Sequence, residues 1–365
     1  MSSFFQQGPA DSFINLITPY RVILDASTLC QLSCPTCPNA TGEIHKHIGH
    51  GYLRFTDFKQ FVDRNPRMKH IELSNWGEIF LNPELEPIIQ YGFEKKIHLS
   101  AVNGANINTL SDDIIEAMVK YKLRALTCSI DGASQETYSK YRIKGHFDAV
   151  LNNIRKINAC KKKYGSTTPQ LIWQFVAFGH NETEIPKARQ MAHNLNMKFA
   201  LKLSWDDLYG KSFSPVQNKA IIRKESGLDV ADRNEYEQKY GRNYLAKTCY
   251  QLWTAPRINY DGRLLGCSIN YWGDYGHVFS QRLKQGLSGE RIRYARQMVL
   301  GRVEARDDIP CTRCKLYRAM KEKKTWVKPS ALVRHFLQGK TRHLLSYQKE
   351  NPIFSHFYGL IKKSQ

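Results

Sequence analysis

The chain has 365 residues, 42% of them hydrophobic, which suits one large folded domain and a smaller one. It has no run of about eighteen apolar residues and no secretory signal near its start, which argues against a membrane-spanning protein and a secreted disulfide scaffold. We therefore expect the nine cysteines to stay reduced in the cytoplasm. The net charge of +21 is compatible with an anionic partner, which is nucleic acid, a membrane surface or a phosphorylated substrate. The alternative is that the basic residues are only a solvated part of the surface.

Strands and helices are predicted to alternate along the first 203 residues. Apolar runs predict strands at residues 21–26, 69–74, 97–102, 124–130, 170–177 and 198–203. Helices are predicted at residues 55–62, 83–93, 111–121, 147–163 and 182–195, with Asn82 capping the second and Ser134 opening one more. This alternation predicts an α/β fold with a mostly parallel sheet, closed or nearly closed as a barrel. The active site of such a fold lies at the carboxyl ends of its strands.

Composition divides the chain into five segments. Residues 1–20 are an N-terminal extension, residues 21–209 form the barrel, and residues 210–246 are polar and read as a linker or covering segment. Residues 247–317 form a second unit around the hairpin signal Asp261-Gly262. Residues 318–365 are a basic tail, with helices expected near residues 330–337 and 352–361.

Three cysteines follow the first predicted strand at spacings of four and three residues, Cys30, Cys34 and Cys37. Three thiolates are one ligand short of a closed tetrahedral zinc site. They can hold a four-iron (4Fe-4S) cluster that leaves one iron open to a ligand. A structural zinc knot and chance clustering are the alternatives. The spacing resembles that of the radical S-adenosylmethionine (SAM) superfamily, whose open iron chelates the amino acid end of SAM.

The later strands are followed by motifs that extend this resemblance, which covers about residues 22–203. The resemblance implies a partial (β/α)6 radical SAM barrel. Gly77-Glu78 resembles the end of the family's glycine-glycine-glutamate motif, which holds the SAM amino group, although Trp76 replaces the first glycine. Thr36 also departs from the family, because many relatives have an aromatic residue before the last cysteine. The remaining cofactor-binding positions expected from the strand ends are Asn103, Ser129, Arg142 and Gln174. 

Ser129 and Arg142 match family positions that contact the ribose and carboxylate of SAM. Asn103 follows the third strand at the equivalent place. Gln174 is expected to point into the barrel, where either SAM or substrate could be its ligand.

A second set of four cysteines, Cys249, Cys267, Cys311 and Cys314, can close a metal site. Spacing alone does not separate zinc from iron and sulfur. The segment resembles the SPASM/twitch extension of radical SAM enzymes, in its twitch form similar to 2-deoxy-scyllo-inosamine dehydrogenase-like enzymes. That resemblance implies one auxiliary 4Fe-4S cluster. Cys128 and Cys160 are expected to be packed thiols without a chemical role.

The resemblance implies an oxidoreductase- or isomerase-type enzyme that cleaves SAM to a 5′-deoxyadenosyl radical. We expect it to dehydrogenate or epimerise a carbohydrate or cyclitol, with reducing electrons from a donor such as flavodoxin or ferredoxin. A peptide-modifying maturase is the first alternative, disfavoured because only about twenty residues precede the first strand. A non-catalytic iron–sulfur or zinc protein that binds nucleic acid through the basic tail is the second. The tail also suits peripheral attachment to an anionic membrane, at its inner face.

Overall fold

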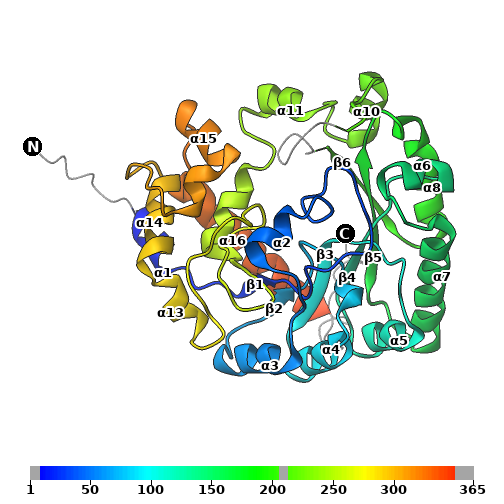
Figure 1. Ribbon diagram of the computed structural model, residues 1–365, viewed down its shortest axis with the longest axis horizontal. Helices are drawn as coiled ribbons and strands as arrows, with labels where there is room; N and C mark the ends of the chain where they lie inside the picture. Colours follow the sequence, from blue (N-terminus) through cyan, green and yellow to red (C-terminus); the bar gives the residue numbers. More distant parts are fainter. Residues whose placement is uncertain (1–8, 205–212, 350–365) are drawn as a thin grey trace, which may run out of the picture.

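The computed structural model describes residues 9–204 and 213–349 and contains a seven-stranded sheet (Figure 1). The strand order is β6-β5-β4-β3-β2-β1-β7, and every neighbouring pair is parallel. The predicted α/β fold with a parallel sheet is therefore confirmed. The strands are β1 (Arg21–Leu24), β2 (His70–Glu72), β3 (His98–Ala105), β4 (Ala125–Ser129), β5 (Gln170–Ala177), β6 (Lys198–Leu203) and β7 (Arg257–Ile258).

Helices between the strands form an arc around the outside of the sheet (Figure 1). Their buried faces follow the apolar spacing, as Val150, Ile154 and Ile157 do on α7. Ser111 caps α5 and Ser134 caps α6, each accepting a hydrogen bond from a backbone N–H three residues on. The helices of this region are α3 (Phe55–Arg64), α4 (Leu85–Glu94), α5 (Asp112–Lys120), α6 (Gln135–Tyr141), α7 (Phe147–Lys163) and α8 (Ile185–Asn194), with short 3-10 turns η1 (Ile79–Leu81) and η2 (Glu182–Glu184).

The predicted start of the second helix was wrong, because Asn82 is used elsewhere. α4 begins at Leu85, and the Asn82 side chain accepts from the backbone N–H of Glu84 before the helix starts. Its amide group donates to the carbonyl oxygens of Ala26 and Leu53, both at 3.0 Å. Asn82 therefore ties the loops at the strand ends together and does not cap a helix.

Several helices were not predicted. Outside the C-terminal part they are α1 (Pro9–Leu16), α2 (Glu43–Ile48), α10 (Lys219–Ser226) and α11 (Arg233–Tyr240). α11 has no buried residue, so no apolar stripe marks it. An ion pair of 2.7 Å between Arg223 and Glu235 joins α10 to α11.

The C-terminal part consists of helices of different lengths around one hairpin. The turn predicted at Asp261-Gly262 forms, since Ile258 and Leu264 make an antiparallel bridge and Gly262 has φ +90°. The helix predicted near residues 330–337 is part of a longer helix, and the one near residues 352–361 lies outside the described residues. The elements are η3 (Ala246–Tyr250), α12 (Gln251–Thr254), α13 (Leu283–Leu287), α14 (Glu290–Val299), η4 (Pro310–Arg313), α15 (Lys315–Glu322) and α16 (Pro329–Lys349).

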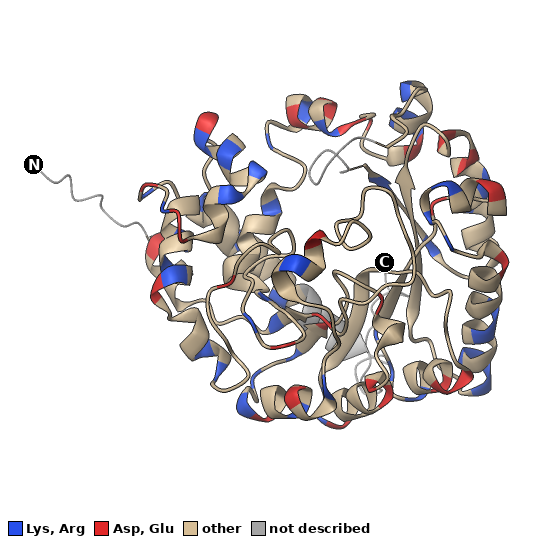
Figure 2. Cartoon of the chain, viewed as in Figure 1, with Lys and Arg blue, Asp and Glu red and all other residues tan. Residues whose placement is uncertain are grey.

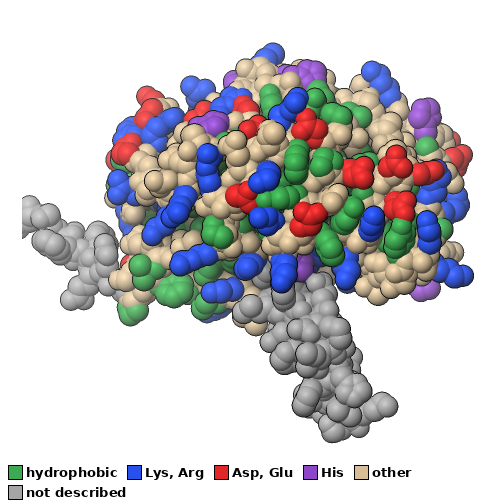
Figure 3. All heavy atoms as spheres, turned by 90° about the horizontal axis from the view of Figure 1, so that it is seen from below, with side chains coloured by type: hydrophobic (Ala, Val, Ile, Leu, Met, Phe, Trp, Pro, Cys, Tyr) green, Lys and Arg blue, Asp and Glu red, His purple; other side chains and the backbone are tan. Residues whose placement is uncertain are grey.

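Charges of both signs cover the outer helices (Figure 2). On the face seen in Figure 3, Lys and Arg lie among acidic and hydrophobic side chains. Several surface cations are paired, such as Lys59 with Asp63 and Lys140 with Glu136. No helix in the described ranges has the length and apolar character needed to cross a bilayer.

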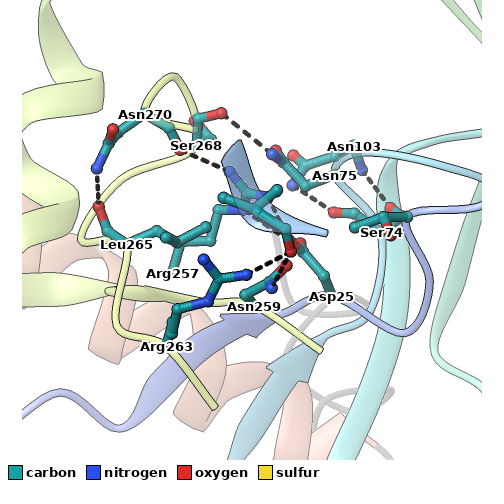
Figure 4. Close-up of polar contacts among 12 residues, drawn as sticks. Asp25, Ser74, Asn75, Asn103, Arg257, Asn259, Arg263, Leu265, Ser268 and Asn270 are labelled. Carbon is teal, nitrogen blue, oxygen red and sulfur yellow. Dashed lines mark hydrogen bonds and ion pairs between the residues drawn. The ribbon is translucent and has the colours of Figure 1, made fainter. Parts of the chain in front are cut away.

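A buried ion pair joins the C-terminal part to the first strand (Figure 4). The side chains of Asp25 and Arg257 are both 0% exposed. Arg257 donates from Nε to Asp25 Oδ2 at 2.9 Å, and its Nη1 donates to the carbonyl oxygen of Asn270 at 2.8 Å. Burial raises the pKa of Asp25, and the adjacent guanidinium opposes that rise. The pair therefore fixes β7 beside β1.

Substitution Arg257→Met tests this junction. It leaves the buried Asp25 carboxylate without its cation, so we expect the free energy of unfolding to fall by about 3–5 kcal/mol. Urea unfolding followed by circular dichroism measures the change. Lys46→Met is the control, because it breaks the exposed pair with Glu43 and should barely move the midpoint. Equal midpoints for the two variants would show that the buried pair does not hold the sheet together.

Candidate functional site

A cavity of about 150 Å³ lies at the carboxyl ends of the strands. Its walls come from the loops after β1 and β2 and from the ends of β3, β4 and β5. All nine residues predicted to hold the barrel cluster or SAM line this one cavity: Cys30, Cys34, Cys37, Gly77, Glu78, Asn103, Ser129, Arg142 and Gln174.

The three cysteines of the loop after β1 face the cavity from a tight turn. The backbone N–H of Cys37 donates to the carbonyl oxygen of Cys34 at 3.1 Å. Side-chain N–H groups approach two of the sulfurs, from Arg142 to Cys34 at 3.7 Å and from Asn106 to Cys30 at 3.8 Å. Burial raises the pKa of Cys30 to about 12 and that of Cys34 to about 11. These thiols therefore keep their protons until a metal centre displaces them.

The Gly77-Glu78 motif packs directly against the cysteine loop. Gly77 has φ +77°, and a Cβ atom there would lie 2.6 Å from the carbonyl oxygen of Ser27 and 2.7 Å from that of Leu29. Only glycine permits this approach. The N–H of Glu78 donates to the same Leu29 oxygen at 2.6 Å.

The Glu78 carboxylate is buried and only partly satisfied. It accepts from the backbone N–H groups of Asn106 at 2.5 Å and Phe80 at 3.2 Å. Burial raises its pKa to about 7, and the hydrogen bonds oppose that rise. A carboxylate with free lone pairs in a buried cavity can accept hydrogen bonds from an ammonium group.

An unpartnered polar atom lies on the opposite wall. Gln174 is 2% exposed, and its Nε2 approaches Ser129 Oγ at 3.5 Å. Its Oε1 is buried and has no hydrogen-bond partner among the described residues. A buried acceptor without a donor costs about 1–3 kcal/mol, which a ligand N–H or O–H would recover. The chemistry of this wall therefore fits a polar ligand.

Two predicted residues are engaged within the protein. Asn103 is exposed, and its side chain donates to the carbonyl oxygen of Ser74 at 2.8 Å. Arg142 donates from Nε to Asp131 Oδ2 at 2.7 Å, and Asp131 also accepts from the N–H of Val176. Asp131 was not among the residues predicted from the sequence. Neither was Asn106, for which no sequence signal exists.

The second cysteine set also meets at one place. Cys249, Cys267, Cys311 and Cys314 line one small cavity together with Tyr275. The Tyr275 hydroxyl lies 3.2 Å from Cys311 Sγ. Burial raises the pKa of Cys267 to about 11 and that of Cys311 to about 12.

Both sets supply soft thiol ligands, which suit iron–sulfur clusters and zinc. In the described ranges, no three His, Cys, Asp or Glu side chains converge as the ligands of a single metal ion do. Thiolates of a four-iron cluster bind separate irons and stand farther apart than the ligands of one ion. The donor type and the shared cavities are thus compatible with clusters at both places.

Comparisons with known proteins show what the chain as a whole is similar to. No protein-family model matches the chain. The AdoMet-dependent heme synthase of Methanosarcina barkeri is 27% identical over 138 residues, which span 37% of this chain and 38% of that protein. The crystal structure of SuiB from Streptococcus suis matches with a TM-score of 0.59 and 13% identity, covering 84% of this chain and 74% of SuiB.

A second SuiB structure, bound to S-adenosylmethionine, matches with a TM-score of 0.57 and 13% identity, covering 82% of this chain and 71% of that one. At this identity the SuiB structures show a shared fold. The sequence match to the heme synthase, over 37% of this chain, agrees with the radical SAM superfamily that the motifs resemble.

Two glycine variants test the contact between Gly77 and the cysteine loop. Gly165 also has a positive φ, of +57°, but a Cβ there meets nothing within 4 Å. We expect Gly165→Ala to lower the free energy of unfolding by only about 1–2 kcal/mol, because alanine disfavours the left-handed conformation. Gly77→Ala should cost clearly more, because it also pushes two backbone segments apart. Urea unfolding measures both, and equal losses would mean that the close packing at Gly77 is unimportant.

Proposed function

We propose that this chain is a radical SAM enzyme that oxidises or epimerises a carbohydrate or cyclitol. The observation that carries the proposal is the meeting in one cavity of three cysteines, five residues in or after strands β2 to β5, and Arg142 at the end of α6. Cys30, Cys34 and Cys37 would hold a four-iron cluster there. When bound and reduced, the cluster would supply the electron that cleaves SAM into methionine and a 5′-deoxyadenosyl radical, which abstracts a hydrogen atom from the substrate.

The remaining residues of the cavity would position SAM. Glu78 would accept hydrogen bonds from its ammonium group, and Gln174 Oε1 would accept from a hydroxyl or amine. Arg142 would hold the loop after α6 against the cysteines through Asp131 and Cys34.

An apolar wall beside the cysteines would exclude water. Leu32, Tyr141, Val176 and Phe178 are buried and pack around Cys34. Such a shell keeps solvent hydrogen donors away from a reactive intermediate.

For the second cysteine set we propose an auxiliary four-iron cluster held by Cys249, Cys267, Cys311 and Cys314. Such a cluster could accept an electron from the substrate and so favour dehydrogenation. Zinc is the alternative metal. A peptide is the alternative substrate, and one SuiB structure is described as bound to the precursor peptide SuiA. Deuterium transfer into 5′-deoxyadenosine from labelled cyclitols or peptides separates these substrates.

Cysteine variants test the two clusters. Anaerobic reconstitution should give about eight iron and eight sulfide per chain if both sets hold four-iron clusters. The triple variant C30A/C34A/C37A should lose about half of the iron and all 5′-deoxyadenosine, and C267A/C311A/C314A should lose the other half. Cys160→Ala is the control and should keep the full iron content and the formation of 5′-deoxyadenosine. If the first variant still forms 5′-deoxyadenosine, the assignment is wrong. Stoichiometric zinc in the wild type that the second variant loses would assign zinc, in place of iron, to the second set.

Substitution Glu78→Gln tests SAM binding separately from chemistry. It removes the negative charge with little change of shape, and a hydrogen bond to a charged group contributes about 1.5–3 kcal/mol. We therefore expect the Kd for SAM to rise about 10–100-fold, as measured by equilibrium dialysis with reconstituted protein. Glu136→Gln, on the exposed side of α6, is the control and should leave the Kd unchanged. An unchanged Kd for Glu78→Gln would remove this residue from the SAM site.

A further inference from the structure

A second, basic cavity lies beside the last strand of the barrel, with a volume of about 380 Å³. Its lining includes three cations, Lys202 from β6 and Arg242 and Lys247 from the segment after α11. Two tyrosines, Tyr236 and Tyr244, complete its aromatic side. No carboxylate is among the described residues that line it. A cavity with this lining favours an anionic ligand.

The strand register places this cavity on the same inner face as the cysteine-lined one. Lys202 is paired with Val176 on the neighbouring strand, and paired residues point to the same side of a sheet. Val176 and Gln174, two positions apart on β5, both line the cysteine cavity. Lys202 therefore points into the barrel, where its electrostatic neighbours are Asp131 and Glu72. One molecule could contact both cavities.

The carboxylates near this cavity on α11 are already engaged. Glu235 pairs with Arg223 at 2.7 Å and Lys219 at 3.3 Å. Glu237 pairs with Lys323 at 2.5 Å and accepts from Asn243 at 3.4 Å.

The cations from the segment after α11 remain available. Neither Arg242 nor Lys247 forms an ion pair within the part of the chain that the structure describes. Both side chains are exposed.

The aromatic side of the cavity is packed against the last strand. The rings of Tyr236 and Tyr244 meet edge to face, with centroids 5.0 Å apart. The Tyr244 hydroxyl also interacts with the backbone of Leu203, next to Lys202 on β6. The segment that carries two of the cations is thereby held against the strand that carries the third.

We propose that this cavity binds the phosphate group of a phosphorylated small-molecule substrate, whose carbohydrate or cyclitol part extends toward the cysteine-lined cavity. The inference rests on the proposed function, because that function supplies the second part of the ligand. Three cations suit a phosphate or diphosphate, which carries more charge than a single carboxylate. Burial lowers the pKa of Lys202, and a bound anion would favour its charged form again.

Binding of inorganic pyrophosphate to the reconstituted full chain tests the site. Isothermal titration calorimetry at constant ionic strength should show saturable binding, and R242Q/K247Q should weaken it about tenfold or more, since each charged contact contributes over 1 kcal/mol. The variant K120Q/R155Q is the matched control, because it removes two exposed cations from α5 and α7. Its Kd should stay unchanged. Equal weakening by both variants would mean unspecific attraction to a basic protein and would overturn the proposal.

Two further readouts separate this inference from the proposed function. If the wild type forms 5′-deoxyadenosine but its pyrophosphate binding does not depend on Arg242 and Lys247, the phosphate site is wrong and the function stands. If no 5′-deoxyadenosine forms but the dependence is seen, the function is wrong and the anion site stands. A third outcome concerns lipids. The wild type would sediment with phosphatidylglycerol vesicles but not bind pyrophosphate, and R242Q/K247Q, but not the control variant, would abolish the sedimentation. That result would assign the cavity to a lipid headgroup and overturn the proposal of a soluble phosphorylated substrate.

Discussion

The buried pair of Asp25 and Arg257 is the contact on which both cysteine sets depend. Asp25 directly follows β1 and precedes the loop with the first three cysteines, and Arg257 begins β7 and the hairpin that leads to Cys267. The guanidinium also lies 5.8 Å from the ring of Trp76, beside the Gly77-Glu78 motif. Both charges are buried away from solvent, so each is stabilised by the other. Moving either segment alone would leave an unpaired buried charge, which costs several kcal/mol of stability.

A smaller polar contact continues this junction into the candidate SAM cavity (Figure 4). Asn75 lines that cavity, and its amide donates at 3.1 Å to the carbonyl oxygen of Ser268, the residue after Cys267. Asn270, which follows in the same loop, donates to the carbonyl oxygen of Leu265. The loop of the second cysteine set is thus hydrogen-bonded to a wall of the first cavity. A change of charge or geometry at one set has a direct physical route to the other.

The sequence predicts those parts of the molecule that repeat or alternate. β5, β6 and α7 have the predicted bounds, and the alternation of side chains on a strand places Ser129 and Gln174 on one wall. Contacts between segments that are far apart in the chain produce no periodic pattern in the sequence. Nothing local marks Arg257 as the partner of Asp25, turns Asn103 toward Ser74, or reveals the polar helices α10 and α11. 

The ion pair between Asp25 and Arg257 also affects the order in which the sheet can form during synthesis. Among the described strands β1 is made first, yet its neighbour β7 begins with Arg257, which comes 232 residues after its partner Asp25. Until then one edge of β1 has no partner, and the Asp25 carboxylate can stay hydrated on the nascent chain. Closure of the sheet on this side is therefore a late event with a high loop-closure entropy, and the desolvation of Asp25 occurs only when Arg257 arrives.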